Sequence, residues 1–299
     1  MSYVVVLILN YNGKGLLEEC LSSYLSNDYH NFDVVLIDNG SSDGSIDFVS
    51  LNFPEVIIKK IQNNKGYSGG FNVGLKFAFD VLNADFVVVS NNDVKSDNKL
   101  IEGLVETINQ DKKIGFVTGK VYWYDYKGKT NILQTVGKSF SQRRIIGNHI
   151  GIYEEDKGQY DKIQERHSCD DVFSMVRKEV YQEVGGYDET FFHEFEEADW
   201  QLRAKSKGFK IYYTYKSKLW HKNSVTTGGQ MSPNIIFHRN RNQIILIKKH
   251  GSFQQTIGFV MIHIFILLPK FIFVNLIKTN YQIAVSSLKG SMFGLLWSR

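Results

Sequence analysis

Two groups of side chains in this sequence have the types and spacing needed for chemistry on a substrate. The first is Asn91-Asn92-Asp93, which follows the apolar residues 86–89 after Ser90. An apolar run without alternation is typical of a strand buried on both faces of a parallel sheet, and ligands of open α/β sheets bind at the carboxyl ends of the strands. Asn91 and Asp93 then offer the hard oxygen ligands that Mg²⁺ or Mn²⁺ accepts beside phosphate. The alternative is a plain turn, since Asn and Asp are common turn formers.

The second group is a cluster of three carboxylates within four residues, Glu196, Glu197 and Asp199. A buried carboxylate can accept a proton from a reacting hydroxyl. The alternative is structural: acids in a first helical turn are favoured by the helix dipole, and Asp199 can pair with Arg203 at i+4. That alternative accounts for one or two acids, whereas three predict a function.

The bulk composition bounds the class of protein and its compartment. A chain of 299 residues can bury a large α/β core. Its two cysteines, Cys20 and Cys169, form no CxxC pair, which predicts a reducing compartment without disulfides or a zinc site. The first residues enter a strand without signal-peptide features, so we expect a cytoplasmic protein.

Charge is distributed unevenly along the chain. Residues 200–299 contain fifteen Lys and Arg and no acid. The net charge of +4 is therefore the sum of −11 on residues 1–199 and +15 on this basic tail. Because the basic residues of the tail are interleaved with long apolar runs, they favour an anionic membrane surface over nucleic acid.

Strand and helix patterns alternate through the first 110 residues. Strands are predicted at 3–9, 34–37, 56–61 and 84–90, with helices after each, which predicts an α/β fold with a mostly parallel sheet. The loops at Asn12, Asp38, Gly66 and Asp93 should then converge at one edge, as in a nucleotide site. A GxGxxG motif after the first strand and a Walker A motif are both missing, which excludes a dinucleotide dehydrogenase and a P-loop NTPase.

The second part of the chain is less regular. We expect a strand at 115–124, an irregular polar region at 125–168, a strand at 171–176, and helices at 178–184 and 191–208. A strand at 210–214 and a segment that ends at His221 close the globular part.

The tail has two patterns. Residues 235–249 predict an amphipathic basic helix, and residues 258–277 form an apolar run of about membrane-spanning length. His263, Pro269, Lys270 and Asn275 interrupt the run, which favours a helix or a bent pair in the membrane interface over a span. The alternative is a core-packing or dimer-forming helical extension.

The ordered motifs resemble the family 2 glycosyltransferases, whose catalytic domain has the GT-A fold. The resemblance covers residues 3 to about 229, and the glycine-rich run is most similar to the branch of bacterial rhamnosyltransferases and galactofuranosyltransferases. The matching segments are residues 10–12 (NYN), 38–45 (DNGSSDGS), 63–74 (NNKGYSGGFNVG), 91–93 (NND), 185–204 (GGYDETFFHEFEEADWQLRA) and 220–229 (WHKNSVTTGG).

The resemblance implies a GT-A catalytic domain at residues 1–229 and a basic, apolar helical extension at 230–299. Residues 1–110 would be the nucleotide-sugar-binding half, and residues 111–229 the acceptor and catalytic half.

The resemblance also implies a nucleotide site. Tyr11 would lie against a pyrimidine base, although a packed aromatic is an equal alternative. Asp38 would accept from the ring N–H of the base, and Asn12 and Asn64 would shape the pocket. The implied nucleotide-binding residues are Asn10, Tyr11, Asn12, Asp38, Asn64, Gly66, Asn91 and Asn92.

For the metal, Asp93 would be the last residue of the family's DxD-type motif. Asn91 replaces the first Asp of that motif, so diphosphate oxygens must complete the shell of Mg²⁺ or Mn²⁺. His221 resembles the late histidine of the family that approaches the metal or the diphosphate, and a hydrogen-bonded histidine is the alternative.

For catalysis, Glu197 occupies the position where the family usually has an Asp base, with Glu196 and Asp199 as the next candidates. Trp200, Asp171 and Phe192 would lie on the acceptor side, the aromatic rings as a platform for a sugar.

These implications together predict an inverting, metal-dependent transferase. It would use a UDP- or dTDP-sugar to extend a cell-surface polysaccharide or a lipid-linked glycan. We expect a peripheral protein at the inner face of the cell membrane, and the helical extension could also form a homodimer. A polyprenyl-phosphate sugar transferase and a non-catalytic nucleotide-sugar-binding assembly partner are the alternatives.

Overall fold

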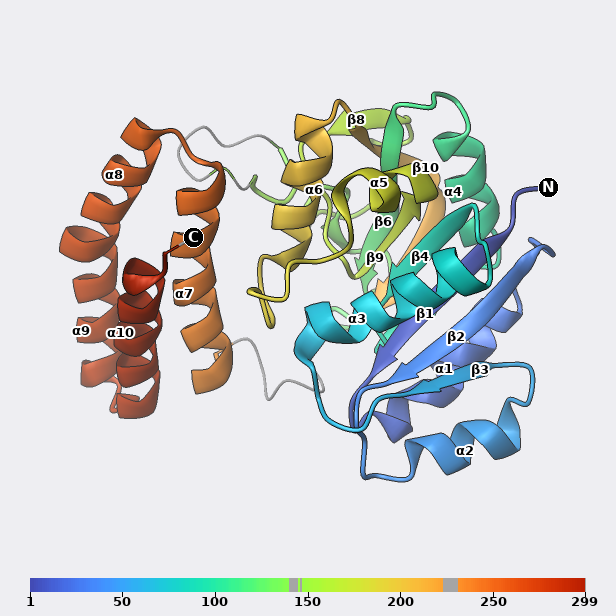
Figure 1. Ribbon diagram of the computed structural model, residues 1–299, viewed down its shortest axis with the longest axis horizontal. Helices are drawn as coiled ribbons and strands as arrows, with labels where there is room; N and C mark the ends of the chain where they lie inside the picture. Colours follow the sequence, from blue (N-terminus) through green and yellow to red (C-terminus); the bar gives the residue numbers. More distant parts are fainter. Residues whose placement is uncertain (140–144, 146, 223–230, 299) are drawn as a thin grey trace.

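The computed structural model describes residues 1–139, 145, 147–222 and 231–298. Within these residues, ten strands form one sheet in the order β3-β2-β1-β4-β9-β6-β10-β5, with β7 paired to β6 and β8 paired to β10. Helices cover both faces of the sheet, and a group of C-terminal helices lies at one end (Figure 1).

The elements have the following bounds. The strands are β1 (Val4–Asn10), β2 (Phe32–Asp38), β3 (Ile57–Lys60), β4 (Phe86–Ser90), β5 (Val94–Ser96), β6 (Ile114–Trp123), β7 (Leu133–Thr135), β8 (Gln164–Arg166), β9 (Phe173–Arg177) and β10 (Lys210–His221). The helices are α1 (Lys14–Leu25), α2 (Ser45–Asn52), α3 (Gly66–Lys76), the π-helical η1 (Phe77–Val81), α4 (Leu100–Ile108), α5 (Lys178–Val184), α6 (Glu196–Ser206), α7 (Pro233–His250), α8 (Phe253–Ile262), η2 (His263–Leu267), α9 (Leu268–Ile277) and α10 (Tyr281–Leu296).

The first half of the sheet is parallel, as the alternating pattern predicts. β1 pairs in parallel with β2 and with β4, and β2 pairs in parallel with β3. Asn10 is in register with Asp38 at the ends of β1 and β2. The polar residues that follow these strands therefore meet at one edge.

The second half is mixed rather than parallel. β9 runs antiparallel to both β4 and β6, and β5 runs antiparallel to β10. The sheet is thus parallel over its first four strands in spatial order and again between β6 and β10, while the α/β class is confirmed.

Alternate residues of β1 enter two separate cores, which explains its unbroken apolar sequence. Val4, Val6 and Ile8 pack with α1 and α4 on one face. Val5 and Leu7 pack with α3, α5 and α6 on the other. Both faces of this central strand are buried, so residues 4–9 are all apolar and the polar Asn10 stands at its end.

Helix α6 begins later than the sequence pattern predicts. The expected start was residue 191, but Glu194 and Phe195 have left-handed φ angles of 73° and 74°. This conformation cannot continue a right-handed helix, so residues 191–195 form a loop ahead of Glu196.

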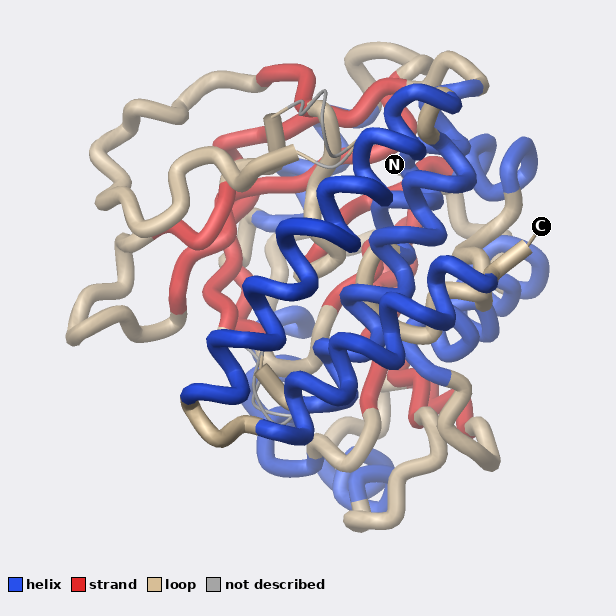
Figure 2. The backbone as a smooth tube through the Cα atoms, turned by 90° about the vertical axis from the view of Figure 1, so that its left-hand side faces the viewer, coloured by secondary structure: helices blue, strands red, loops and turns tan. Residues whose placement is uncertain are grey.

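The C-terminal helices form an antiparallel group, in which α10 packs against α7 and α9 (Figure 2). Gly290 and Gly294 allow this close approach, since a Cβ on them would lie 2.3 Å from the Phe237 carbonyl oxygen and 2.7 Å from the Arg241 carbonyl oxygen. The expected basic helix is α7. The expected boundary after residue 229 falls outside the described residues, as does the 223–229 part of the last motif.

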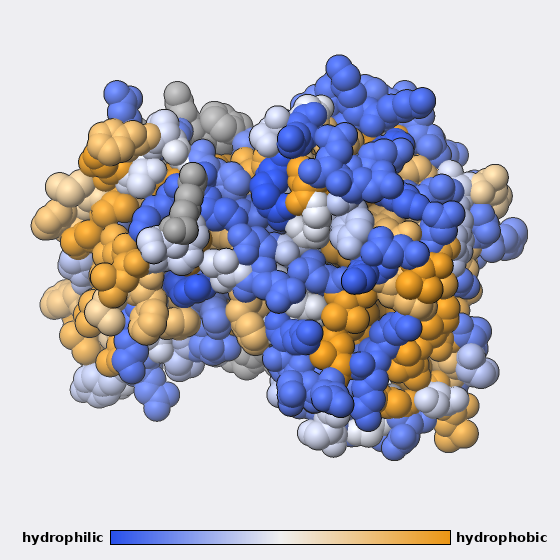
Figure 3. All heavy atoms as spheres, in the orientation of Figure 1, coloured by the Kyte–Doolittle hydropathy of each residue, from blue (hydrophilic) through white to orange (hydrophobic). Residues whose placement is uncertain are grey.

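The apolar run forms a longer helix than predicted. In the described part of the chain, one helix, Phe253–Ile277, is long and apolar enough to cross a membrane. Its side chains remain largely exposed: Phe265 is 67% and Phe273 is 64% exposed. Apolar side chains gather over α8, α9 and α10 at the left of the space-filling view (Figure 3).

Candidate functional site

Three buried polar residues brace the sheet edge at the ends of β1, β2 and β4. The Asn92 side-chain amide donates to Asn10 Oδ1 at 2.8 Å. The Asn10 amide in turn donates to Asp38 Oδ1 at 3.3 Å and to Ser41 Oγ at 3.2 Å. This network fixes the spacing of the three loops.

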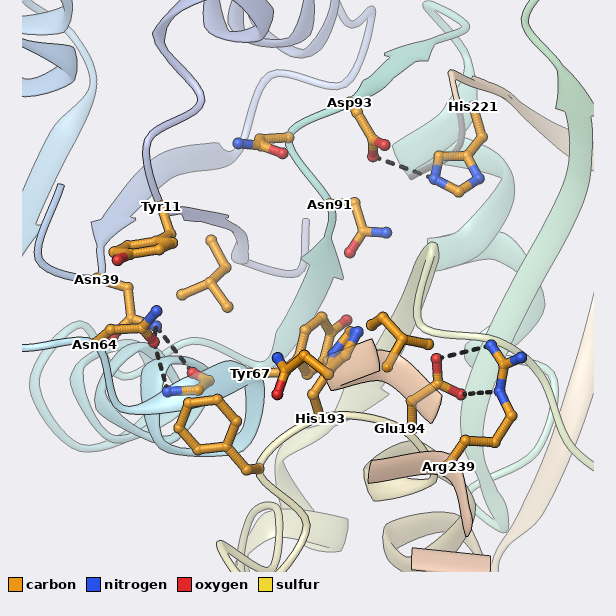
Figure 4. Close-up of a pocket in the computed structure, with 16 residues that line it drawn as sticks. Tyr11, Asn39, Asn64, Tyr67, Asn91, Asp93, His193, Glu194, His221 and Arg239 are labelled. Atoms are coloured by element: carbon orange, nitrogen blue, oxygen red, sulfur yellow. Dashed lines mark hydrogen bonds and ion pairs between the residues drawn. The ribbon is translucent and has the colours of Figure 1, made fainter. Parts of the chain in front are cut away.

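A cavity of about 450 Å³, the Tyr11 cavity, opens above this network (Figure 4). Tyr11 and Asn64 lie at one end, Asp93 and His221 lie at the other, and Asn91 is between them. The expected residues Tyr11, Asn64, Gly66, Asn91, Asn92, Asp93, Phe192 and His221 all line it.

Three of the expected nucleotide-binding residues do not line this cavity. Asp38 and Asn10 are fully buried beneath it, so the predicted contact of Asp38 with a base is wrong. Asn12 is exposed, and its Oδ1 accepts from the Ser42 N–H at 2.8 Å, which shapes the loop rather than the pocket.

The residue that replaces Asp38 in the cavity wall is its neighbour Asn39, which the sequence reasoning missed. The Asn39 amide donates to Asn64 Oδ1 at 3.1 Å and to the Gly66 carbonyl at 2.9 Å, and Asn39 Oδ1 accepts from Lys65 N–H. It lies one residue beyond the end of β2, where alternation turns its side chain to the opposite face from Asp38. The period-two pattern of β2 was the signal that could have identified it.

Gly66 is required at the start of α3 for two reasons. Its φ of +73° is left-handed, and a Cβ there would lie 2.5 Å from the Phe192 carbonyl oxygen. The neighbouring Tyr67 N–H donates to that same carbonyl at 2.8 Å. The glycine therefore lets the loop of Phe192 close over this part of the cavity.

Asp93 and His221 form a pair that fits a divalent cation. His221 Nε2 lies 3.2 Å from Asp93 Oδ1, and both side chains are about 95% buried. On its other side, His221 Nδ1 lies 2.9 Å from Gln134 Oε1, which orients the ring so that Nε2 faces the carboxylate. A ring nitrogen and a carboxylate oxygen at this separation can share a cation or a proton between them.

The two side chains supply only part of a coordination shell. Among the described residues, no group of three or more His, Cys, Asp and Glu is placed to hold a metal. Asn91 stands where a further carboxylate would be, so oxygens of a bound phosphate would have to complete the shell.

A second cavity of about 500 Å³, the Lys138 cavity, adjoins the first. Five residues line both cavities: Tyr67, Asn91, His193, Glu194 and Arg239. Besides Glu194, which pairs with Arg239, four carboxyl groups line the Lys138 cavity, those of Asp170, Asp171, Glu196 and Glu197. The two cavities thus form one cleft, with the Asp93–His221 pair in one part and an acidic cluster in the other.

Lys138 balances two of these carboxylates. Its ammonium contacts Asp170 and lies 3.2 Å from Glu197 Oε1. Burial alone would raise the pKa of Asp170, but the attraction of Lys138 outweighs it and holds that pKa well below its ordinary range. Glu197 is 14% exposed and faces the cavity, so it combines a fixed position with access to a substrate.

The other two carboxyl groups retain protons. Burial, and next the charge of Glu197, raises the pKa of Asp171 to about 8. The same two causes raise the pKa of Glu196 well above its ordinary value, and its Oε2 is buried without a hydrogen-bond partner. Near neutral pH Asp171 and Glu196 therefore add little negative charge to the cavity.

Two expected site residues lie in the core instead. Asp199 is fully buried and contacts Arg203, Lys249 and His250, at 2.7, 2.5 and 2.8 Å. The hydrogen bond with His250 and the contacts with Arg203 and Lys249 outweigh the effect of burial and hold the pKa of Asp199 well below its ordinary range, so Asp199 is not a base. Trp200 is also fully buried, and its Nε1 donates to the Gly185 carbonyl, so its predicted role as a sugar platform is wrong. Phe192 is 38% exposed and lines the Tyr11 cavity.

The fold and this cleft define a GT-A glycosyltransferase fold. Solved structures support this: "GalNAc-T7 with UDP, GalNAc and Mn2+" matches with a TM-score of 0.64 at 13% identity over 83% of this chain and 48% of that one. The mannosyltransferase of Pyrobaculum calidifontis "in complex with GDP-Man and Mn2+" matches with a TM-score of 0.61 at 13% identity over 99% and 87%.

The sequence of this chain matches the family described as "Glycosyltransferase like family 2" over residues 2–235, and the chain belongs to that family. A curated relative is the poly-beta-1,6-N-acetyl-D-glucosamine synthase of Staphylococcus aureus, 22% identical over 245 residues, which are 81% of this chain. The chain spans 55% of the length of that relative.

Proposed function

We propose that the protein is an inverting, divalent-metal-dependent glycosyltransferase that moves a sugar from a UDP- or dTDP-sugar to a polysaccharide or lipid-linked glycan. The observation that carries the proposal is the continuous cleft, which has the Asp93–His221 pair in one cavity and Glu197 in the other. A sugar bound between them would have its leaving group and its attacking hydroxyl on opposite sides.

The chain's residues suit the two halves of such a step. An acceptor hydroxyl attacks the anomeric carbon, the bond to the diphosphate breaks, and the hydroxyl proton passes to the Glu197 carboxylate. Asp93 and His221 would hold the cation, which neutralises charge on the departing diphosphate. The protonated states of Glu196 and Asp171 limit repulsion around Glu197.

The donor class is inferred from the far end of the Tyr11 cavity. Tyr11 is 45% exposed and offers a ring face for a base, and the exposed Asn64 offers its side-chain amide, which the buried Asn39 orients. The solved structures of similar fold include complexes with UDP and with GDP-Man, so a purine donor is the comparison to include in a test.

The tail supports a lipid-linked or surface acceptor. The exposed apolar side chains of Phe253–Ile277 and α10, with Lys270, Lys278 and Lys289 among them, suit an anionic membrane at the inner face of the cell membrane. This surface also favours polyprenyl phosphate itself as a second candidate acceptor. A homodimer through the same helices is the competing explanation of their exposure.

The test is release of nucleoside diphosphate from UDP-N-acetylglucosamine, dTDP-rhamnose and GDP-mannose with Mn²⁺, together with thermal shift for binding. Glu197→Gln should retain binding and lower turnover by about 100-fold or more, whereas Asp93→Ala should lose metal-enhanced binding.

Glu183→Gln and Asp80→Ala change exposed acids elsewhere and serve as matched controls. Binding without turnover in the wild-type protein, over all donors and acceptors, would instead support a non-catalytic nucleotide-sugar-binding protein. Nucleotide binding by Asp93→Ala that still responds to Mn²⁺ would exclude Asp93 from the metal site.

A further inference from the structure

We propose that Asn242 of α7 is a positioning residue that holds the loop from which Glu196 and Glu197 enter the Lys138 cavity. The inference deepens the proposed function, on which its kinetic readout rests. Helix α7 then contributes to the site, although its sequence predicts that it belongs to a separate C-terminal extension.

The loop ahead of α6 has a conformation that needs support. Glu194 and Phe195 are consecutive residues with side chains and have φ angles of 73° and 74°. Each such residue is held in a sparsely populated region at a cost that neighbouring contacts must offset. The Phe195 carbonyl accepts from the Asp199 N–H at 3.1 Å, so the loop sets where α6 begins and which way its first acids point.

Asn242 supplies that support from a fully buried position. Its side-chain amide donates to two consecutive carbonyls of the loop, His193 O at 2.8 Å and Glu194 O at 2.9 Å. Arg241 Nη1 donates to Asn242 Oδ1 at 2.7 Å, which fixes the orientation of the amide, and to Thr190 O at 2.8 Å.

This pattern requires an asparagine. The residue must donate twice and accept once from a short side chain, which Asn does and Asp cannot, because a carboxylate has no donor. A carboxylate at this site would face two carbonyl oxygens, and a residue without donors would leave both buried carbonyls unpaired.

A second contact from the same face of α7 acts on the side chain of the loop. Arg239, three residues before Asn242, places two guanidinium nitrogens 3.2 Å from the two carboxylate oxygens of Glu194 (Figure 4). Glu194 and Arg239 line both cavities. Helix α7 therefore fixes the loop at the junction of the cavities, by hydrogen bonds to the loop backbone and by the ion pair with the Glu194 side chain.

The consequence is specific to the transfer step. If the Asn242 bonds are lost, the loop can relax and displace Glu197, whereas Tyr11, Asn64 and Asp93 stay on the sheet edge. We expect a fall in kcat of about 100-fold, the size produced by a displacement of about 1 Å, with the KM for the donor changed much less.

The experiment compares Asn242→Asp, which is nearly isosteric, with Asn242→Ser, which keeps one donor. Asn240→Asp is the matched control, since Asn240 lies on the same helix and donates only within it, to Ile236 O. Hydrogen–deuterium exchange of residues 190–200 is measured alongside nucleoside diphosphate release from UDP-N-acetylglucosamine or dTDP-rhamnose with Mn²⁺.

The expected result is faster exchange confined to the loop and the start of α6, a low kcat in Asn242→Asp, an intermediate kcat in Asn242→Ser, and wild-type values in Asn240→Asp. Exchange equal to wild type, faster exchange with unchanged kcat, or global unfolding of Asn242→Ser would each overturn the positioning role. If the wild-type protein releases no nucleoside diphosphate, the proposed function fails, and the exchange result decides the role of Asn242 alone.

Discussion

Replacement of Lys138 by Met removes the charge of this side chain and keeps most of its volume, so the variant shows the effect of the charge. Lys138 is only 8% exposed and is the cation shared by Asp170 and Glu197. At the 3.2 Å separation from Glu197, one charge pair is worth about 5 kcal/mol with an effective dielectric constant of about 20. We expect about half of this energy to be lost in the variant, since Glu197 is partly exposed and the variant can relax.

Turnover should fall in Lys138→Met, because Glu197 loses the ammonium that fixes its position. The variant should also be less stable at pH 7 by about 3 kcal/mol, because two buried carboxylates lose their cation. The lowered pKa of Asp170 stabilises the folded protein above a pH of about 4 and loses that effect as the pH falls. The stability gap should therefore close in acid.

The assay is nucleoside diphosphate release at pH 7, with urea unfolding at pH 2 and pH 7. Lys112→Met, at an exposed position, is the control. Unchanged turnover in Lys138→Met would refute the assignment of Lys138 as a residue that positions Glu197. A stability gap as large at pH 2 as at pH 7 would refute the ion-pair explanation of its cost.

Two further predictions concern the buried acid beside Glu197 and the apolar tail. Burial and the charge of Glu197 raise the pKa of Asp171 to about 8, so the folded protein keeps a proton that the unfolded chain releases near pH 4. Asp171 therefore lowers the stability of the folded protein increasingly as the pH rises from about 4 to about 8. Asp171→Asn should gain Tm relative to wild type from pH 5 to pH 8, and parallel Tm curves would contradict the raised pKa. Phe265→Lys with Phe273→Lys should weaken binding to phosphatidylserine vesicles, whereas Leu51→Lys, at an exposed apolar residue on α2, should not. If the double variant is monomeric and still binds vesicles, dimer contacts rather than membrane binding would explain the exposed apolar side chains of these helices.

Much of the first half of the fold could be predicted because its information is local. Unbroken apolar runs identified β1 and β4, and the polar residues after them had to meet at the edge of a parallel sheet. This argument placed Gly66 and Asp93 at one cavity, and the family resemblance of the ordered motifs placed Tyr11 and Asn64 there as well.

What the sequence by itself determined was therefore the class of fold and the residues at strand ends, because strand period and chain order fix them. Tertiary structure decided that Asn39 rather than Asp38 lines the cleft, and that Asp199 is paired with basic side chains in the core. It also brought Lys138 to the acids and α7 to the loop before them. Buried charge pairs and side-chain contacts of this kind join distant segments, and only their positions in space show whether a carboxylate is neutralised in the core or left facing a substrate.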